Sequence, residues 1–184
     1  MLKILVFLLG VLIGTMGTAA AGDMTNDSER YLVGDGHVGL IDSGLTPDGV
    51  NQVVRDVYQG RSVDAVEPVG EGRSARVTNI YIPAAAADQP AIKLIWDEAG
   101  KIYRLEACSS QFMTRQGIHA GSSWNEIVSI YPDAKLGFEN IIAFYPGEKV
   151  TCMFDPHANV DWEAIRSGRT SVPGDLPVWR LFTY

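Results

Sequence analysis

Residues 92–107 have the sequence IKLIWDEAGKIYRLEA, which is the strongest hairpin pattern in the chain. Apolar side chains stand at every second position in both halves: Ile92, Leu94 and Trp96 in the first, Tyr103, Leu105 and Ala107 in the second. A period of two indicates a strand with one buried face, and the intervening residues 97–100 (DEAG) have the composition of a tight turn. The stretch therefore predicts an antiparallel hairpin.

Further strand patterns lie on both sides of this hairpin. The expected strands are, in chain order, a turn-linked pair in residues 31–42, then 63–65, 77–82, 141–145, 150–154 and 178–184. Pro146 and Gly147 separate two of these runs as a hairpin turn would. We expect all of these strands to build one antiparallel sheet with the hairpin.

A ten-residue pattern occurs twice, at residues 44–53 (GLTPDGVNQV) and 121–130 (GSSWNEIVSI). In both copies a glycine turn precedes a hydroxyl residue, Thr46 or Ser123, that can cap a helix N-terminus. Glu126 stands three residues after Ser123, so the second copy has the composition of a capping box. The pattern predicts two helices in two similar turn-helix-hairpin units, residues 40–108 and 117–184. A further short helix is expected at residues 161–167.

These elements predict an α+β fold, an antiparallel sheet with two helices on one face. A single domain is expected over residues 31–184, preceded by a flexible, polar N-terminal segment at 22–30.

The first 21 residues have the features of a secretion signal. Lys3 supplies a positive start, residues 4–16 are almost entirely apolar, and Ala19 and Ala21 satisfy the small-x-small rule for cleavage. An apolar run of this length is shorter than the roughly 20 residues of a membrane-spanning helix. We therefore expect a periplasmic or secreted protein that meets the membrane only through its cleaved signal.

Charge makes nucleic acid an unsuitable partner. The chain of 184 residues has a net charge of −7, and loss of Lys3 with the signal would make it −8. Lys and Arg are scattered and form no basic stripe of the kind that binds a phosphate backbone.

Two cysteines, Cys108 and Cys152, are present in a chain expected to enter an oxidising compartment. A disulfide between them is the default expectation there. The bond would close a loop of about 45 residues and contribute roughly 4 kcal/mol in the chain-entropy model. Two unlinked buried thiols are the alternative.

No motif for catalysis, a metal or a cofactor is found in the sequence. The three histidines, His37, His119 and His157, stand in no ligand pair, and the nucleophile motif Gly-x-Ser-x-Gly is lacking. We expect no metal and no cofactor. A catalytic site would have to be assembled in space from dispersed His, Asp and Glu side chains.

Aromatic residues are the candidates for a binding surface. Trp96, Tyr103 and Trp179 stand in or beside predicted strands, where a large ring either packs in the core or anchors a partner. Both interpretations stay open from the sequence.

Four scaffold motifs carry a resemblance to a known family. They are residues 39–47 (GLIDSGLTP), 117–127 (GIHAGSSWNEI), 145–148 (YPGE) and 178–180 (VWR), in this order after the signal. The chain resembles a bacterial envelope-protein family whose best-known member is a small sigma-E-regulated lipoprotein of unknown function. This resemblance implies a periplasm-facing domain without an assigned activity. The chain differs in lacking a lipid-attachment cysteine, and Cys108 has no match in the family pattern.

The repeat unit alone is also similar to β-lactamase-inhibitor-like and outer-membrane-assembly-lipoprotein domains, which bind proteins with the open face of a sheet. Together these features predict an exported, non-catalytic binding module for an envelope protein or a cell-wall component. A small hydrolase with a site built from dispersed His, Asp and Glu, or a structural envelope-stress protein, are the alternatives.

Overall fold

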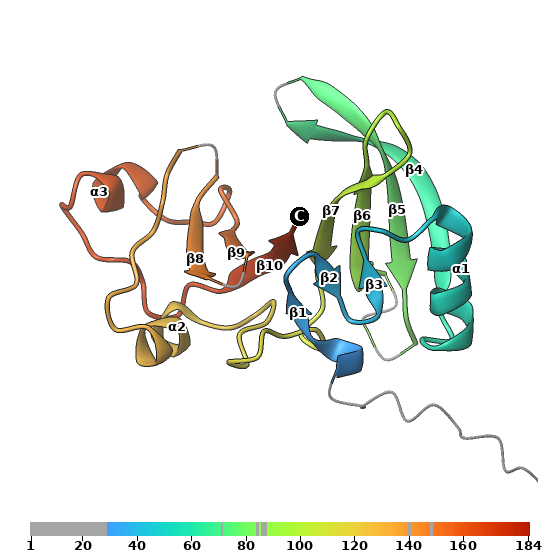
Figure 1. Cartoon of the computed structure of the whole chain (residues 1–184). Helices are drawn as coiled ribbons and strands as arrows, with labels where there is room; N and C mark the ends of the chain where they lie inside the picture. Colours follow the sequence, from blue (N-terminus) through green and yellow to red (C-terminus); the bar gives the residue numbers. More distant parts are fainter. Residues whose placement is uncertain (1–28, 71, 84, 86–87, 140, 148) are drawn as a thin grey trace, which may run out of the picture.

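The computed structural model describes residues 29–184 apart from positions 71, 84, 86–87, 140 and 148 (Figure 1). The expected signal at 1–21 and most of the expected N-terminal segment at 22–30 lie outside the described residues. The described chain begins with a 3-10 helix, η1 (Glu29–Tyr31). Within the described residues no helix is both long and apolar enough to cross a membrane.

A seven-stranded antiparallel sheet forms the centre of the fold (Figure 1). Its strands are β4 (Arg61–Gly70), β5 (Arg73–Tyr81), β6 (Ile92–Trp96), β7 (Ile102–Ala107), β8 (Ala143–Gly147), β9 (Val150–Phe154) and β10 (Val178–Thr183). The spatial order is β4-β5-β6-β7-β10-β9-β8. The last strand, β10, therefore lies between β7 and β9 and joins two hairpin systems that are far apart in the sequence.

A small sheet and two helices cover one face of the seven-stranded sheet. These are a small sheet of β1 (Val33–Gly34), β2 (His37–Val38) and β3 (Ile41–Asp42), and the helices α1 (Pro47–Asp56) and α2 (Trp124–Ile130). Buried side chains of both helices belong to the same hydrophobic cluster as the sheet residues Leu94 and Leu105. The predicted α+β class with two helices on one sheet face is confirmed. A third helix, α3 (Trp162–Arg166), follows β9, as expected.

Both predicted helix caps are confirmed. The Thr46 hydroxyl accepts a hydrogen bond from the Gly49 N–H at 3.2 Å. Ser123 accepts from the Glu126 N–H at 3.3 Å, and the Glu126 carboxylate accepts from the Ser123 N–H at 2.6 Å, which completes the capping box. The elements after the two helices differ, with four strands after α1 and strands interrupted by α3 after α2. Duplication of the whole unit therefore stays a prediction.

The hairpin at 92–107 is confirmed, but one side chain departs from the predicted alternation. Leu94 pairs with Leu105, and the register then shifts so that Trp96 pairs with Ile102. Tyr103 has no strand partner at this register shift, as the extra residue of a β-bulge has none. Its side chain points away from the core and is exposed. Ile102 takes the buried position that the alternation assigned to Tyr103.

The expected disulfide is not formed, since Cys108 and Cys152 are both free thiols. Ala107 pairs with Leu181 of β10, and Leu181 pairs with Cys152 of β9. The Cα atoms of Ala107 and Cys152 are therefore two strand spacings apart, roughly 10 Å, and Cys108 is the residue next to Ala107. A disulfide needs Cα atoms within about 7 Å of each other. The inserted strand β10 therefore separates the two cysteines. Burial raises the pKa of the Cys108 thiol to about 11 and that of Cys152 to about 12.

Thiol titration tests this separation. Unfolding in the absence of reductant should expose two reactive thiols per chain, and the melting temperature should be the same with and without dithiothreitol. In the folded protein at pH 8 both thiols should react slowly, because the thiolate is the reactive form and both pKa values lie well above this pH. The Cys108→Ala variant is the control. A mass lower by two hydrogens in the wild type, or a melting temperature that dithiothreitol lowers in the wild type alone, would contradict the structure.

Candidate functional site

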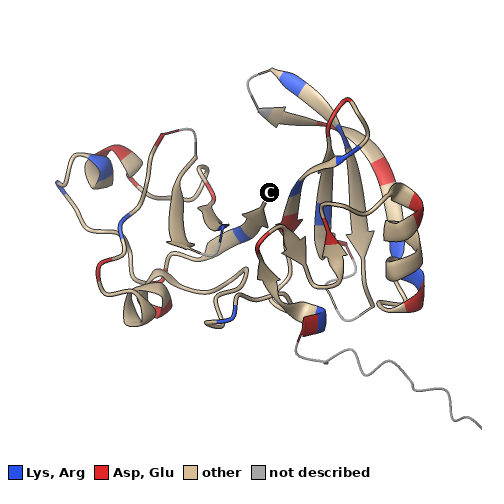
Figure 2. Cartoon of the chain, viewed as in Figure 1, with Lys and Arg blue, Asp and Glu red and all other residues tan. Residues whose placement is uncertain are grey.

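The sheet face opposite the helices carries charged side chains in its middle. Five of them form what we call the charged row: Glu67, Lys93, Arg104, Glu106 and Arg180. Glu106 on β7 has two strand partners: Lys93 on β6 and Phe182 on β10. We call this side of the sheet the open face. Figure 2 marks the positions of Lys, Arg, Asp and Glu along the strands of this sheet.

Glu106 is the most deeply buried member of the charged row. Its side chain is 2% exposed and forms ion pairs with Arg104, at 2.8 Å between Nη2 and Oε1, and with Arg180. Arg104 precedes Glu106 by two residues on β7, and Arg180 comes from the adjacent strand β10. A buried carboxylate is costly unless it is paired and hydrogen-bonded, and the two arginines supply these partners to Glu106.

Glu67 bends the β4–β5 hairpin over the open face. Its strand partner on β5 is Ala75, yet its carboxylate accepts hydrogen bonds from Asn79, four residues farther along β5, and from Lys93 on β6, both at 2.7 Å. The hydrogen bond from Lys93, and then that from Asn79, lower the pKa of Glu67. The hairpin consequently arches above the neighbouring strands (Figure 1).

Three buried polar atoms around the charged row have no hydrogen-bond partner among the described residues: Asn79 Oδ1, Arg104 Nε and Arg180 Nε. An unsatisfied buried polar group costs about 1–3 kcal/mol. Replacing a buried ion network by packed apolar side chains often leaves the stability of a fold unchanged or raises it. Stability alone is therefore a weak explanation for such a network. The charged row therefore marks the open face as a place to look for a ligand.

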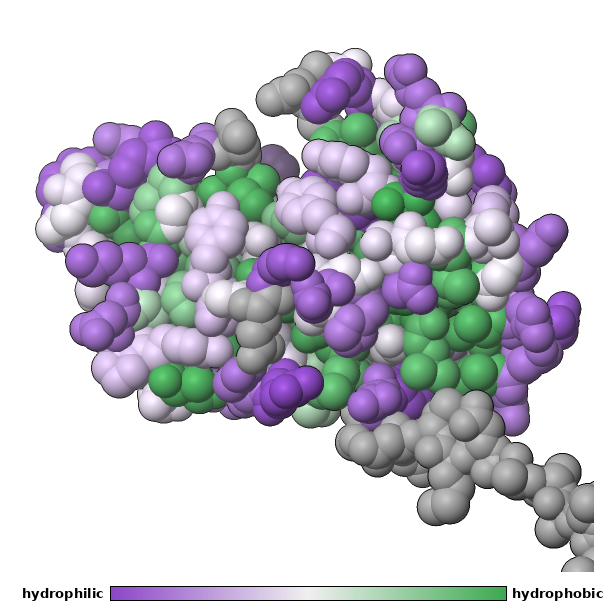
Figure 3. Space-filling view, viewed as in Figure 1, coloured by the Kyte–Doolittle hydropathy of each residue, from purple (hydrophilic) through white to green (hydrophobic). Residues whose placement is uncertain are grey.

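A cavity of about 520 Å³ lies under the arch at the edge of the charged row. It is lined by Val69, Arg73, Ser74, Ala75, Arg76, Ile95, Trp96, Asp97, Glu98, Tyr103 and Arg104. We call it the arch cavity. Figure 3 shows the molecule in space-filling form, with a notch in its outline between the β4–β5 hairpin and the lobe that contains β8 and β9. The lining combines arginines with aromatic rings, which are the residue types enriched at binding hot spots.

The structure brings together two of the three predicted aromatic residues. Trp96 is 3% exposed and donates from Nε1 to the Thr78 hydroxyl at 2.8 Å, while Tyr103 is 57% exposed and packs edge-on against Tyr184. Both line the arch cavity. Trp96 is thus mainly a core residue, and Tyr103 is the one available to a partner.

Trp179 lies elsewhere, in a second cavity of about 280 Å³ with Phe138, Met153 and Arg166. The guanidinium carbon of Arg180 lies 3.5 Å from the centre of its ring. Trp179 therefore contacts the charged row through Arg180 but does not share a cavity with Tyr103.

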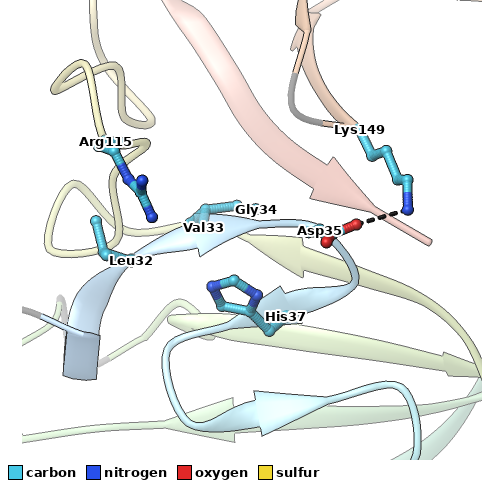
Figure 4. Close-up of a pocket in the computed structure, with 7 residues that line it drawn as sticks. All are labelled: Leu32, Val33, Gly34, Asp35, His37, Arg115 and Lys149. Carbon is cyan, nitrogen blue, oxygen red and sulfur yellow. Dashed lines mark ion pairs between the residues drawn. The ribbon is translucent and has the colours of Figure 1, made fainter.

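A third cavity, of about 420 Å³, lies beside β1 (Figure 4). Figure 4 shows Lys149 pairing with Asp35 across its rim at 2.6 Å, with Arg115 and His37 on the lining. The Lys149 hydrogen bond lowers the pKa of Asp35. Both partners are largely exposed, and an exposed pair of this kind is screened by salt. We therefore regard this cavity as a weaker candidate than the arch cavity.

The three histidines do not converge. His37 lines the cavity beside β1, the His119 ring lies 2.9 Å from the Ala120 carbonyl oxygen, and His157 is exposed after β9. Neither His119 nor His157 lines that cavity or the arch cavity. Within the described part of the chain no group of three His, Cys, Asp or Glu is placed to hold a metal ion.

The sequence did not point to Glu106, Arg104 or Arg180. In an alternating hairpin a charged residue between two apolar ones is expected to face water, and Glu106 has this position between Leu105 and Ala107. Its burial depends on β10, which follows more than 70 residues later. The one local signal for the buried ion pair is that Arg104 and Glu106 have opposite charges and stand two residues apart, which places them on one face of the strand.

Comparison with known proteins gives a structural relative. No protein-family model matches the chain, and no curated protein does. The fold is similar to the crystal structure of the uncharacterized protein yfeY from Escherichia coli, with a TM-score of 0.51 over 84% of this chain and 96% of that chain. The sequences are 13% identical, so the likeness shows the fold alone. The relative is itself uncharacterized, in agreement with the expectation of a family of unknown function.

The lowered pKa of Glu67 predicts a pH-dependent contribution to stability. A carboxyl whose folded pKa lies below its unfolded value of 4.5 stabilises the fold above that pH, and this contribution is lost as the pH falls through the folded pKa. Glu67→Gln should therefore lower the free energy of unfolding by about 1 kcal/mol at pH 7 and by much less at pH 3. Urea unfolding at both pH values measures the difference.

Lys93→Gln provides the background control for this experiment. Without the Lys93 ammonium the main cause of the pKa shift is gone, so the effect of Glu67→Gln should change little with pH. An effect that is equal at pH 7 and pH 3 in the wild-type background would contradict the assigned role of the ion pair.

Proposed function

We propose that this chain is an exported, periplasmic binding module without catalytic activity, and that its ligand site is the arch cavity on the open face. The observation that supports the proposal is the meeting of Tyr103 with Arg104 and with the apolar residues Val69 and Ile95 beneath the β4–β5 hairpin. Ligand sites of proteins commonly have volumes of about 300–1,000 Å³, and the arch cavity falls in this range.

The walls of the arch cavity are held in place before any ligand arrives. On the open face Arg104 is fixed by Glu106; on the α1 face of the sheet the Arg76 guanidinium pairs with Asp64 at 2.7 Å and lies 5.2 Å from the centre of the Trp96 ring. A site whose side chains are already ordered loses less conformational entropy on binding. This favours recognition of a ligand over a purely structural role for the open face.

The sequence supports the proposed export and the proposed kind of ligand. Residues 1–21 have the features of a secretion signal, and the four scaffold motifs resemble an envelope-protein family. We infer that the ligand belongs to the same compartment and is either a segment of an envelope protein or a cell-wall component. A hydrolase is not proposed, because the histidines that it would use do not meet in one cavity.

Retention of ligands on a column that carries the immobilised protein tests the site. The mature protein is immobilised, and solubilised cell-wall fragments and envelope proteins are passed over it separately at physiological salt. Tyr103→Ala should weaken retention of the bound fraction about tenfold, because loss of an exposed aromatic anchor costs on the order of 1–2 kcal/mol.

Tyr145→Ala is the matched control, since Tyr145 is similarly exposed (59%) but lies on β8, outside the arch cavity. It should retain the same fraction as the wild type. Equal losses in both variants, or no retention of either fraction by the wild type, would show the proposed function to be wrong.

A further inference from the structure

A second polar cavity, of about 270 Å³, lies between the N-terminal half of α1 and the strands β4 and β5. We call it the α1 cavity. Its polar or aromatic lining consists of Asn51, Ser62, Asp64, Arg76, Thr78 and Trp96. These side chains come from one helix and three strands, so only the folded chain brings them together. A concave site where a few polar groups converge is the usual form of a ligand site.

A chain of hydrogen bonds orients the Asp64 carboxylate in this cavity. The Trp96 indole N–H donates to the Thr78 hydroxyl at 2.8 Å, and that hydroxyl donates to Oδ1 of Asp64 at 2.6 Å. Arg76 donates to Oδ2 at 2.7 Å. The hydrogen bond from Thr78, together with Arg76, lowers the pKa of Asp64, so the carboxylate is charged at neutral pH. An acceptor that is fixed in this way loses little conformational entropy when a ligand binds.

Hydrogen-bond donors stand beside this acceptor. The Asn51 Oδ1 accepts from the Ser62 hydroxyl at 2.6 Å, and the N–H groups of the same amide make no hydrogen bond among the described residues. The side chains of Asp64 and Arg76 are 55% and 47% exposed, so a ligand can reach both from solvent. The α1 cavity therefore offers one carboxylate acceptor next to amide and guanidinium donors.

The charges in the α1 cavity balance. Asp64 is its one acid and Arg76 its one base, and the two pair with each other. A charged ligand would meet no excess of opposite charge there. A hydroxyl group has one donor and two acceptor lone pairs, so it can donate to Asp64 while it accepts from Asn51. Neighbouring hydroxyls on a ring would satisfy the carboxylate and both kinds of donor at once.

We propose that the α1 cavity binds a neutral cyclic polyol, such as a hexose, whose hydroxyls donate to Asp64 and accept from Asn51 and Arg76. This inference does not rest on the proposed function. Arg76 and Trp96 line both cavities, but Tyr103 lines the arch cavity alone, and Asp64 and Asn51 line the α1 cavity and not the arch cavity.

Titration with matched cyclic alcohols tests the inference. The probes myo-inositol and cyclohexanol share a six-carbon ring without charge and differ in the number of hydroxyl groups. Each is titrated into the isotope-labelled protein, and the Trp96 indole N–H signal and the backbone amides of residues 50–51, 62–64 and 76–78 report binding. The inositol should bind at least tenfold more tightly than cyclohexanol. Its affinity should be the same at low and high salt, because salt screens only interactions between charges.

Glucose and methyl glucoside distinguish a free sugar from a sugar unit of a glycan, since the methyl group blocks the anomeric hydroxyl as a glycosidic bond does. Equal affinities would assign the site to a glycan unit, and weaker binding of the glucoside would assign it to a free sugar. Both results support a polyol site.

Asp64→Asn is the main variant, because it keeps the shape of the side chain and removes its charge. It should weaken binding of myo-inositol about tenfold, since hydrogen bonds to an ionised group are roughly twice as strong as neutral ones. Asp56→Asn is the matched control and should bind as the wild type does. Asp56 also pairs with an arginine, Arg55, at 2.7 Å, and its side chain is 50% exposed, but it does not line the α1 cavity.

Asn51→Ala is a second variant that leaves every hydrogen bond of Asp64 in place. It should weaken binding of myo-inositol about fivefold, as expected for the loss of one hydrogen bond. Equal binding of the two alcohols, a Trp96 signal that neither probe moves, or equal losses in Asp64→Asn and Asp56→Asn would overturn the inference. The dependence of column retention on Tyr103 tests the arch cavity separately.

Discussion

The carboxylate of Glu106 has almost no access to water, and the middle of the sheet is arranged around this constraint. Arg104 is its neighbour on the same strand, but Arg180 can reach it only because β10 lies beside β7. The same placement of β10 joins the β8–β9 hairpin to the rest of the sheet. A C-terminal strand in any other position would leave Glu106 with one partner and divide the sheet in two.

The shape of the open face follows from the same charged row. Lys93, the strand partner of Glu106, also donates to Glu67, and this contact with that of Asn79 holds the β4–β5 hairpin over the face. The arch provides the roof of a cavity whose floor is β6 and β7. Arg104 lines this cavity on one side and the hairpin lines it on the other. The ion pairs of the charged row therefore shape both the sheet and the site that we propose for a ligand.

Local patterns were sufficient to predict much of the fold. The hairpin at 92–107, the caps at Thr46 and Ser123, and the closing strand follow from periodicity and capping chemistry within about ten residues. The insertion of β10 depends on contacts across the chain that no local pattern encodes. That insertion explains one error and one omission: Cys108 and Cys152 are separated and not bonded, and the burial of Glu106 was not predicted. The register shift that turns Tyr103 outward was likewise invisible, so the sequence could name Tyr103 as a candidate but not the arginines beside it.

The free energy of unfolding of Glu106→Gln, measured by urea denaturation at pH 7, tests whether this carboxylate organises the sheet. Glutamine keeps the shape of the side chain and removes the charge that both arginines share. Because breaking a buried ion pair from one side commonly costs about 3–5 kcal/mol, the account predicts a loss of about 3 kcal/mol or more. The exposed Glu98→Gln, in the turn of the same hairpin, should change the free energy by less than about 0.5 kcal/mol. A Glu106→Gln protein as stable as the wild type would contradict the view that this carboxylate organises the sheet.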